Sequence, residues 1–235
     1  MKKNYAFIFA RGGSRELKNK NIKLFNDKPL IYYSINIAKK NKNIKKVFVS
    51  SDSSVILRIA KKYGAEIILR PKKLSTDKSF EIDAWKHAIN QLLKKNEKFD
   101  NFISLPCTSP LRTSSDISRA INLISKKNDI VVGISKSKKY PDFNMVKKNG
   151  NTLDLLSKKK NIHNRQKSSK TFDLTTIIYA SPLNFIKNIK KTFWEGNVKF
   201  IEIPQIRSID IDNLSDFNLA QIIYKNQKKL KININ

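Results

Sequence analysis

The chain has 235 residues, of which 40% are hydrophobic, and a formal net charge of +29. This length fits one α/β domain with a sizeable core, or at most two small ones, and the apolar share excludes general disorder. No apolar run reaches the roughly 18 residues that a membrane span needs. The short apolar run at residues 5–10 leads into a glycine turn, which indicates a strand and not a signal peptide, so we expect a cytoplasmic protein.

The positive charge is spread along the chain, with lysine pairs near predicted helix ends and in loops. Such charge can attract nucleic acid, anionic lipid or small anionic substrates, but solvated surface lysine is the simpler interpretation. The single cysteine, Cys107, excludes an internal disulfide, as is typical of a reducing compartment. A catalytic thiol needs an activating histidine. Because nothing ties His87 or His163 to Cys107, we predict a loop or core cysteine.

Apolar runs alternate with helical patterns along most of the chain. The sequence predicts strands at residues 5–10, 46–50, 65–69, 101–105, 130–134, 175–180 and 198–203. It predicts helices at residues 29–40, 53–63, 79–94, 114–125 and 215–229. Pro29 suits the start of the first helix, and Gly64 closes the second. The alternation indicates an α/β fold over residues 1–235, with a mostly parallel sheet covered by helices on both faces.

Residues 135–172 break this alternation. The segment is rich in Lys, Ser and Asn, and it contains short possible strands around residues 143–146. A loop of this length without structure is unusual inside a compact domain. We therefore expect an excursion that leaves the sheet and meets a partner subunit.

Ligands of open α/β sheets bind at the carboxyl ends of the strands, and polar motifs fall at these ends. The first motif is Ala-Arg-Gly-Gly-Ser at residues 10–14, which continues to Lys20. Paired glycines let backbone N–H groups approach a phosphate, while Arg11 and Lys20 supply positive charge. A plain Gly-Gly turn is the alternative, and the flanking cations favour phosphate binding.

The second motif is Ile-Asp-Ile-Asp at residues 209–212. On a strand-like stretch, Asp210 and Asp212 point to the same face. Two carboxylates beside phosphate oxygens form an environment that suits Mg²⁺. The alternative is a helix start in which Asp212 or Asn213 caps the following helix, and this explains only one of the two acids.

The third motif is the run Leu-Pro-Cys-Thr-Ser-Pro-Leu-Arg at residues 105–112. Its prolines fix the backbone, and the hydroxyls of Thr108 and Ser109 can hold a ligand or cap the next helix. A purely structural turn explains the pattern equally well. Arg70 follows another strand and offers a guanidinium at the same rim, whereas Arg165 lies in the excursion, where a surface arginine is the ordinary interpretation.

Together these motifs resemble the acylneuraminate cytidylyltransferase family, whose members make CMP-sialic acid and related CMP-nonulosonic acids. The ordered match covers nearly the whole chain. It includes residues 10–14 with Lys20 and Asn21, Ser-Asp at 51–52, Arg-Pro at 70–71, Leu-Ser-Thr-Asp at 74–77, Thr-Ser-Pro-Leu-Arg at 108–112, Arg-Gln at 165–166, Tyr179 and Ser-Ile-Asp-Ile-Asp at 208–212.

The resemblance implies a Rossmann-like fold of the nucleotide-diphospho-sugar transferase type and transfer of CMP from CTP to an acidic sugar. It implies a nucleotide site of Arg11, Gly12, Gly13, Ser14, Lys20, Asn21, Arg70 and Ser79. It implies sugar contacts from Thr108, Ser109, Arg165, Gln166 and Tyr179, and a Mg²⁺ site of Asp210 and Asp212. Arg11, Lys20 and Asp212 are the expected catalytic residues. The excursion corresponds to the family's dimerisation region, so a homodimer is expected, without a nucleic-acid or membrane partner.

The chain departs from the family mainly at the expected sugar end. Pro106–Cys107 replaces a Gln-Pro pair, Thr175–Thr176 replaces Asn-Gly, and residues 15–18 lack the usual glycine and proline. The acceptor therefore stays open among sialic, legionaminic and other nonulosonic acids, and no residue stands out as a general base. A 3-deoxy-manno-octulosonate or other sugar nucleotidyltransferase is the enzyme alternative, and a basic nucleic-acid-binding protein is the alternative from another class.

Overall fold

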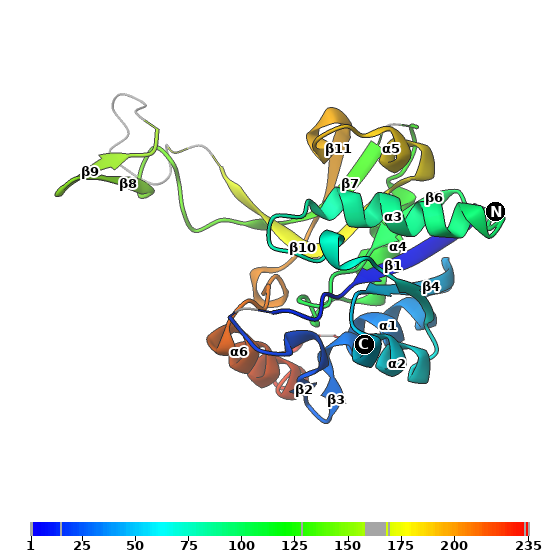
Figure 1. Ribbon diagram of the computed structural model, residues 1–235. Helices are drawn as coiled ribbons and strands as arrows, with labels where there is room; N and C mark the ends of the chain where they lie inside the picture. The colour runs from blue at the N-terminus through cyan, green and yellow to red at the C-terminus, as the bar shows by residue number, and fades with distance from the viewer. Residues whose placement is uncertain are drawn as a thin grey trace.

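A computed structural model describes residues 2–14, 16–127, 129–157, 168, 170–232 and 234. In this part of the chain, a central seven-stranded sheet has the order β11-β7-β10-β6-β1-β4-β5 (Figure 1). Its strands are β1 (Asn4–Phe9), β4 (Ile44–Ser51), β5 (Glu66–Leu69), β6 (Asn101–Ser104), β7 (Asp129–Lys136), β10 (Phe172–Pro182) and β11 (Asn197–Glu202). Strand β10 is antiparallel to β6 and β7, and the other neighbouring pairs are parallel. The prediction of a mostly parallel sheet is confirmed.

Helices cover both faces of the sheet, as predicted (Figure 1). Aliphatic side chains join one face to α1 (Leu30–Lys40), α2 (Ser54–Lys62) and α4 (Ser114–Asn122). A more aromatic core joins the other face to α3 (Glu81–Lys94) and α5 (Leu183–Asn188). Successive strand residues serve opposite cores, because side chains alternate across a sheet. In β1, Ala6 and Ile8 face the aliphatic core, and Phe7 stacks on Phe48 and Phe102 in the aromatic one.

Local signals set several helix ends. The Ser53 side chain accepts the N–H of Ile56 at 3.4 Å and begins α2, and Gly64, with φ of +81°, follows its end. The final helix, α6 (Leu214–Lys225), begins at a capping box of Asn213 and Asp216 and ends four residues before the predicted boundary of 229. Helix α5 was not predicted, because it spans only six residues.

A third apolar cluster packs α6 against a small hairpin of β2 (Leu24–Phe25) and β3 (Lys28–Pro29). Short 3₁₀ helices complete the connections: η1 (Lys20–Ile22), η2 (Lys72–Leu74), η4 (Phe193–Glu195) and η5 (Gln205–Arg207). No described helix combines the length and apolar character that a membrane crossing needs.

Beyond the sheet, the chain forms an arm at the place where the sequence predicts an excursion. Strands β8 (Val146–Asn149) and β9 (Thr152–Leu155) pair as an antiparallel hairpin that stands away from the main body (Figure 1). The strand expected around residues 143–146 begins only at its last residue, and residues 141–144 form turns instead. The arm's contact with a partner subunit stays a prediction.

Candidate active site

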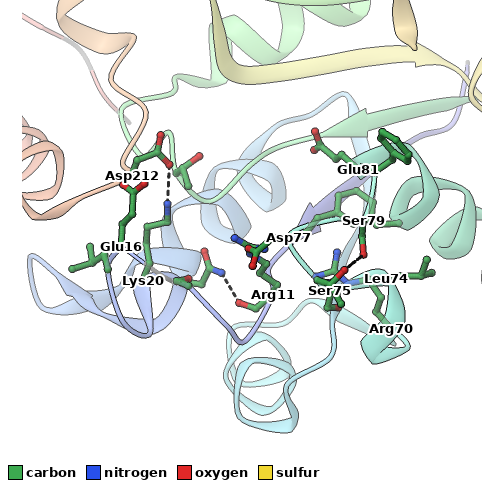
Figure 2. Close-up of a pocket in the computed structure, with 18 residues that line it drawn as sticks. Arg11, Glu16, Lys20, Arg70, Leu74, Ser75, Asp77, Ser79, Glu81 and Asp212 are labelled. Atoms are coloured by element: carbon green, nitrogen blue, oxygen red, sulfur yellow. Dashed lines mark hydrogen bonds and ion pairs between the residues drawn. The ribbon is translucent and has the colours of Figure 1, made fainter. Parts of the chain in front are cut away.

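A cavity of about 450 Å³ opens at the carboxyl ends of the parallel strands (Figure 2). Arg11 and Ser14 come from the loop after β1, Arg70 follows β5, and Thr108 follows β6. Eight of the predicted site residues line the cavity: Arg11, Ser14, Lys20, Asn21, Arg70, Ser79, Thr108 and Asp212. The fold therefore brings together residues that are up to about 200 positions apart in the sequence, as ligand sites of α/β sheets require.

The glycine turn after β1 is held by the neighbouring strand. The N–H of Gly12 donates to the Asp52 carboxylate at 2.9 Å, and the Asn21 amide donates to the Arg11 carbonyl at 3.0 Å. A Cβ on Gly12 would lie 3.1 Å from the Cβ of Ser53, whereas a Cβ on Gly13 would meet nothing within 4 Å. The N–H of Gly12 therefore helps to shape the loop, and its expected role in the nucleotide site stays a prediction.

Arg11 and Asp77 connect two walls of the cavity. Arg11 Nη1 lies 2.6 Å from Asp77 Oδ1, and both side chains are about one-third exposed, at 37% and 36% (Figure 2). Asp77 belongs to the Leu-Ser-Thr-Asp motif after β5 and lines the cavity, although it was not among the predicted site residues. A phosphate that reaches Arg11 would compete with this carboxylate, since both are anions that pair with a guanidinium.

Lys20 joins the glycine-loop motif to the acidic motif near the C-terminus. Its Nζ donates to the Ile211 carbonyl at 2.6 Å and to Asp212 Oδ1 at 3.1 Å (Figure 2). Lys20 is the first residue of η1, which follows Asn19 in a left-handed conformation with φ of 56°. This contact brings the cation of one predicted motif next to the carboxylate of the other.

Asp210 and Asp212 lie on either side of the buried Ile211, in an irregular segment and not in a strand. The Ile211 N–H donates to the Thr108 carbonyl at 2.9 Å, which fixes the segment against the loop after β6. Asp210 Oδ1 is buried and has no hydrogen-bond partner among the described residues. The cap of α6 is Asn213, so the capping alternative does not use the Asp212 carboxylate.

This pair of carboxylates fits Mg²⁺ of the kind that binds together with a substrate. The described residues contain no group of three or more His, Cys, Asp or Glu side chains that could hold a metal ion. Mg²⁺ commonly uses one or two carboxylates together with substrate phosphate oxygens and water. The unpartnered Asp210 oxygen is therefore consistent with a metal ligand, while Asp212 contacts Lys20 in the structure.

The loop at residues 105–112 is mostly a structural clamp. The buried Arg112 guanidinium donates to the carbonyls of Ile177 and Pro106 and to the Ser34 hydroxyl, and burial lowers its pKa to about 10. The Ser109 hydroxyl is buried against Thr176, with the two oxygens 2.6 Å apart. Of the two hydroxyl residues predicted to contact the sugar, Thr108 lines the cavity and Ser109 does not.

Tyr179 lies on β10, opposite Ser104 of β6, and its ring packs on Trp85 at a centroid distance of 5.4 Å. Burial raises the pKa of its hydroxyl, and the negative charges of Glu81 and Asp210 raise it further. It does not line the cavity. Arg165 and Gln166 lie outside the described residues. Of the three described residues that were predicted to contact the sugar, Thr108 lines the cavity, and Ser109 and Tyr179 do not.

Cys107 is buried, and burial raises the pKa of its thiol to about 12. A thiol needs a lowered pKa or a base to act as a nucleophile. The prediction of a core cysteine is confirmed.

One further acid of the cavity wall, Glu81, was not assigned from the sequence, and it lies near the predicted Arg70. Glu81, the first residue of α3, lines the cavity, and its Oε1 accepts the Trp85 indole N–H at 3.2 Å. The cleft walls desolvate Glu81 and raise its pKa, whereas its hydrogen bond from Trp85 and the charge of Arg70 lower it. Burial lowers the pKa of Arg70, and the charge of Asp52 opposes this shift. In the sequence, only the position of Glu81 in the first turn of a predicted helix could have pointed to the site. Acidic residues are common at that position without a binding role, so the position alone does not predict one.

Comparisons with known proteins agree with this geometry. A family model described as Cytidylyltransferase matches residues 5–229. Post-translational flagellin modification protein B of Campylobacter coli is 33% identical over 93% of this chain and 93% of its own length. CMP-N,N'-diacetyllegionaminic acid synthase of Campylobacter jejuni is 31% identical over 92% of both chains. N-acylneuraminate cytidylyltransferase of Escherichia coli is 31% identical over 97% of this chain, which spans only 54% of that protein.

The fold has similar solved structures. The CMP:2-keto-3-deoxy-manno-octonic acid synthetase structure with CTP superposes with a TM-score of 0.71 over 96% of this chain and 99% of that chain, at 15% identity. This likeness supports the fold alone. From the family match over nearly its whole length and from its relatives at 31–33% identity, the chain belongs to the cytidylyltransferase family of nucleotidyltransferases.

Proposed function

We propose that this enzyme transfers CMP from CTP to the anomeric hydroxyl of an acidic nonulosonic sugar and releases pyrophosphate. The contact between Lys20 and Asp212 carries the proposal, because in it the cation of the glycine-loop motif lies beside the acidic motif at one end of the cavity. A nucleoside triphosphate and a metal ion need such an arrangement. Relatives that span this chain almost completely are named for acylneuraminate and legionaminic acid, which supports the acceptor class.

In the reaction, the anomeric oxygen of the sugar attacks the α-phosphorus of CTP. A new P–O bond forms, the bond to the bridging oxygen of the β-phosphate breaks, and pyrophosphate leaves with the electron pair while the hydroxyl proton goes to solvent. Arg11 and Lys20 would hold the phosphate oxygens, and the Asn21 contact with the Arg11 carbonyl keeps the loop in place. Positioning and charge neutralisation supply most of the catalysis of such transfers.

Mg²⁺, when bound, would neutralise negative charge on the phosphate oxygens, and Asp210 and Asp212 are the residues that would hold it. The Ile211 backbone, fixed between Lys20 and Thr108, would set the position of both carboxylates. No described side chain is assigned as a general base.

The proposal includes a homodimer formed through the arm and a cytoplasmic location. The arm exposes apolar side chains at Val146, Leu153 and Leu155, which a partner subunit could cover. Arg165 and Gln166 of the same excursion would then contact the sugar. The family match does not favour the nucleic-acid-binding alternative, and the octulosonate synthetase supports the fold alone at 15% identity.

The test is pyrophosphate release from CTP and Mg²⁺ with sialic, legionaminic and 3-deoxy-octulosonic acids in separate reactions. Release with sialic or legionaminic acid, and none without a sugar, is the expected result. Release only with 3-deoxy-octulosonic acid would contradict the proposed acceptor class. If the protein does not bind CTP in a direct titration, the proposed function is wrong.

A further inference from the structure

The cavity has two chemically different ends. Lys20 and Asp212 lie at one end, and Arg70, Leu74 and Glu81 lie at the other, with Arg11 and Asp77 between them (Figure 2). Apolar side chains contribute to the wall beside Glu81, including Leu74, Phe80 and Ala84. The phosphates of a nucleotide with their metal ion suit the end where Lys20 lies beside the carboxylates of Glu16 and Asp212. A flat base suits apolar walls with a few placed polar groups. If CTP binds as proposed above, its base therefore lies at the end that holds Arg70 and Glu81.

Among the described residues, neither Glu81 nor Arg70 forms an ion pair within 4 Å, although their charges attract each other over a longer distance. The one hydrogen bond of the Glu81 side chain in the described structure comes from Trp85, at 3.2 Å, and Glu81 forms no ion pair there. Arg70 is only 6% exposed, and its Nε is buried without a hydrogen-bond partner among the described residues. A buried N–H without a partner is costly, so the Arg70 Nε retains a donor that a ligand can satisfy. The Glu81 carboxylate, with one hydrogen bond from Trp85, can accept another.

The hydrogen-bond acceptor Glu81 and the donor Arg70 match the polar edge of cytosine. An ionised carboxylate only accepts hydrogen bonds, and a guanidinium only donates them. Cytosine carries an amino donor at position 4 and acceptors at O2 and N3, whereas uracil carries a carbonyl oxygen at position 4. A carboxylate opposite position 4 therefore binds cytosine and repels uracil.

Building on the proposed function, we propose that Glu81 selects the base of the nucleotide: its carboxylate accepts a hydrogen bond from the cytosine 4-amino group, while Arg70 donates to the acceptor edge. The hydrogen bond from the Trp85 indole does not itself require an acid at this position, because an amide would also accept it. Glu81 is exposed and lines the cavity, so its carboxylate is accessible to a ligand.

The test compares Glu81→Gln with the unmodified protein by calorimetric titration of CTP, UTP and 2′-deoxy-CTP, with Mg²⁺ and without sugar. Glutamine keeps the size of Glu81 and an acceptor for Trp85, but its amide can also donate to uracil O4. We expect the ratio of CTP affinity to UTP affinity to fall by about 10-fold or more, with the ratio of CTP to 2′-deoxy-CTP unchanged. Asp83→Asn is the matched control, because Asp83 is an exposed acid in the same helical turn and does not line the cavity.

Two outcomes overturn this inference. An unchanged ratio of CTP to UTP affinity in Glu81→Gln would show that Glu81 does not select the base. A change confined to the ratio of CTP affinity to 2′-deoxy-CTP affinity would show that Glu81 contacts the ribose hydroxyl and not the base. The proposed function fails separately, if the unmodified protein does not bind CTP or does not release pyrophosphate with any nonulosonic acid.

Discussion

The backbone N–H of Gly12 donates to the Asp52 carboxylate at 2.9 Å, so the residue that follows β4 shapes the loop that follows the neighbouring strand β1. The two glycines of the motif consequently have different surroundings. Gly12 packs against the start of α2, while Gly13 faces open space. The loop conformation that presents Arg11 to the cavity depends on this contact between neighbouring strands.

Gly12→Ala and Gly13→Ala form a matched pair. A Cβ on Gly12 would lie 3.1 Å from Ser53 Cβ, so the loop or α2 must shift by a few tenths of an ångström. We expect Gly12→Ala to lower the free energy of unfolding by about 1 kcal/mol and to weaken CTP binding. Gly13→Ala should leave stability equal or slightly higher, because alanine reduces the freedom of the unfolded chain. Urea unfolding and CTP titration measure both effects, and equal results for the two variants would contradict this account.

Asp212→Ala should separate catalysis from stability. The Asp212 side chain is 64% exposed, and its contact with Lys20 is a surface ion pair that contributes little to stability. We expect the melting temperature to stay nearly unchanged while pyrophosphate release falls by about 100-fold or more, the scale seen when a group that stabilises the transition state is removed. Chelation of Mg²⁺ should stop the unmodified enzyme in the same assay. Near-normal turnover of the variant with Mg²⁺ would contradict the metal assignment.

The ion pair of Arg207 and Asp116 should stabilise the segment that carries the acidic motif. Arg207 Nη2 lies 3.1 Å from Asp116 Oδ1, and the Asp116 side chain is 1% exposed. Asp116→Asn retains an acceptor for the Thr113 N–H but removes the charge opposite Arg207. Because loss of one partner of a buried pair leaves an uncompensated charge, we expect a loss of about 3–5 kcal/mol in unfolding free energy at pH 7.

The pH dependence of that loss follows from the pKa of Asp116. Burial by itself raises this pKa, but the hydrogen bonds and charge of Arg207, together with Thr113, lower it overall. A pKa that is lower in the folded state stabilises the protein above the unfolded value of about 3.9. This stabilisation is lost as the pH falls from there through the folded pKa. The difference between the unmodified protein and Asp116→Asn should therefore shrink when urea unfolding is repeated toward pH 3, and a constant difference would contradict the pairing.

Cys107 should resist alkylation in the folded protein. It is 2% exposed, and its raised thiol pKa, about 12, leaves almost no thiolate at pH 8. Iodoacetamide at pH 8 should therefore leave both the mass and the activity of the native enzyme unchanged. Denatured protein is the control and should take up one label, because the chain contains a single cysteine. Rapid labelling of the native protein with loss of turnover would indicate an accessible thiol at the site.

Much of the fold was predictable because its signals are local. The apolar run of β1, the helical spacing of α1 and the Ser53 and Gly64 boundaries of α2 each depend on residues close together in the sequence. The short helix α5 and the two-residue strands of the β2–β3 hairpin carry too few residues for a periodic signal. The antiparallel placement of β10 between β6 and β7 depends on pairings between distant segments, with a register shift between Thr175 and Tyr179.

The site residues also divide into those with a local sequence signal and those that only the tertiary structure identifies. Arg11, Lys20 and Asp212 stood out in the sequence because a glycine turn with cations and a pair of alternating acids are unusual local patterns. Only the tertiary structure placed Asp77 opposite Arg11, Glu81 on the cavity wall, and Ser109 against Thr176 away from it. An acid in a helix first turn and a hydroxyl in a loop are common in any sequence. Whether such a side chain faces a ligand or the protein interior depends on the packing of strands and helices that are distant along the chain, and no local pattern contains that information.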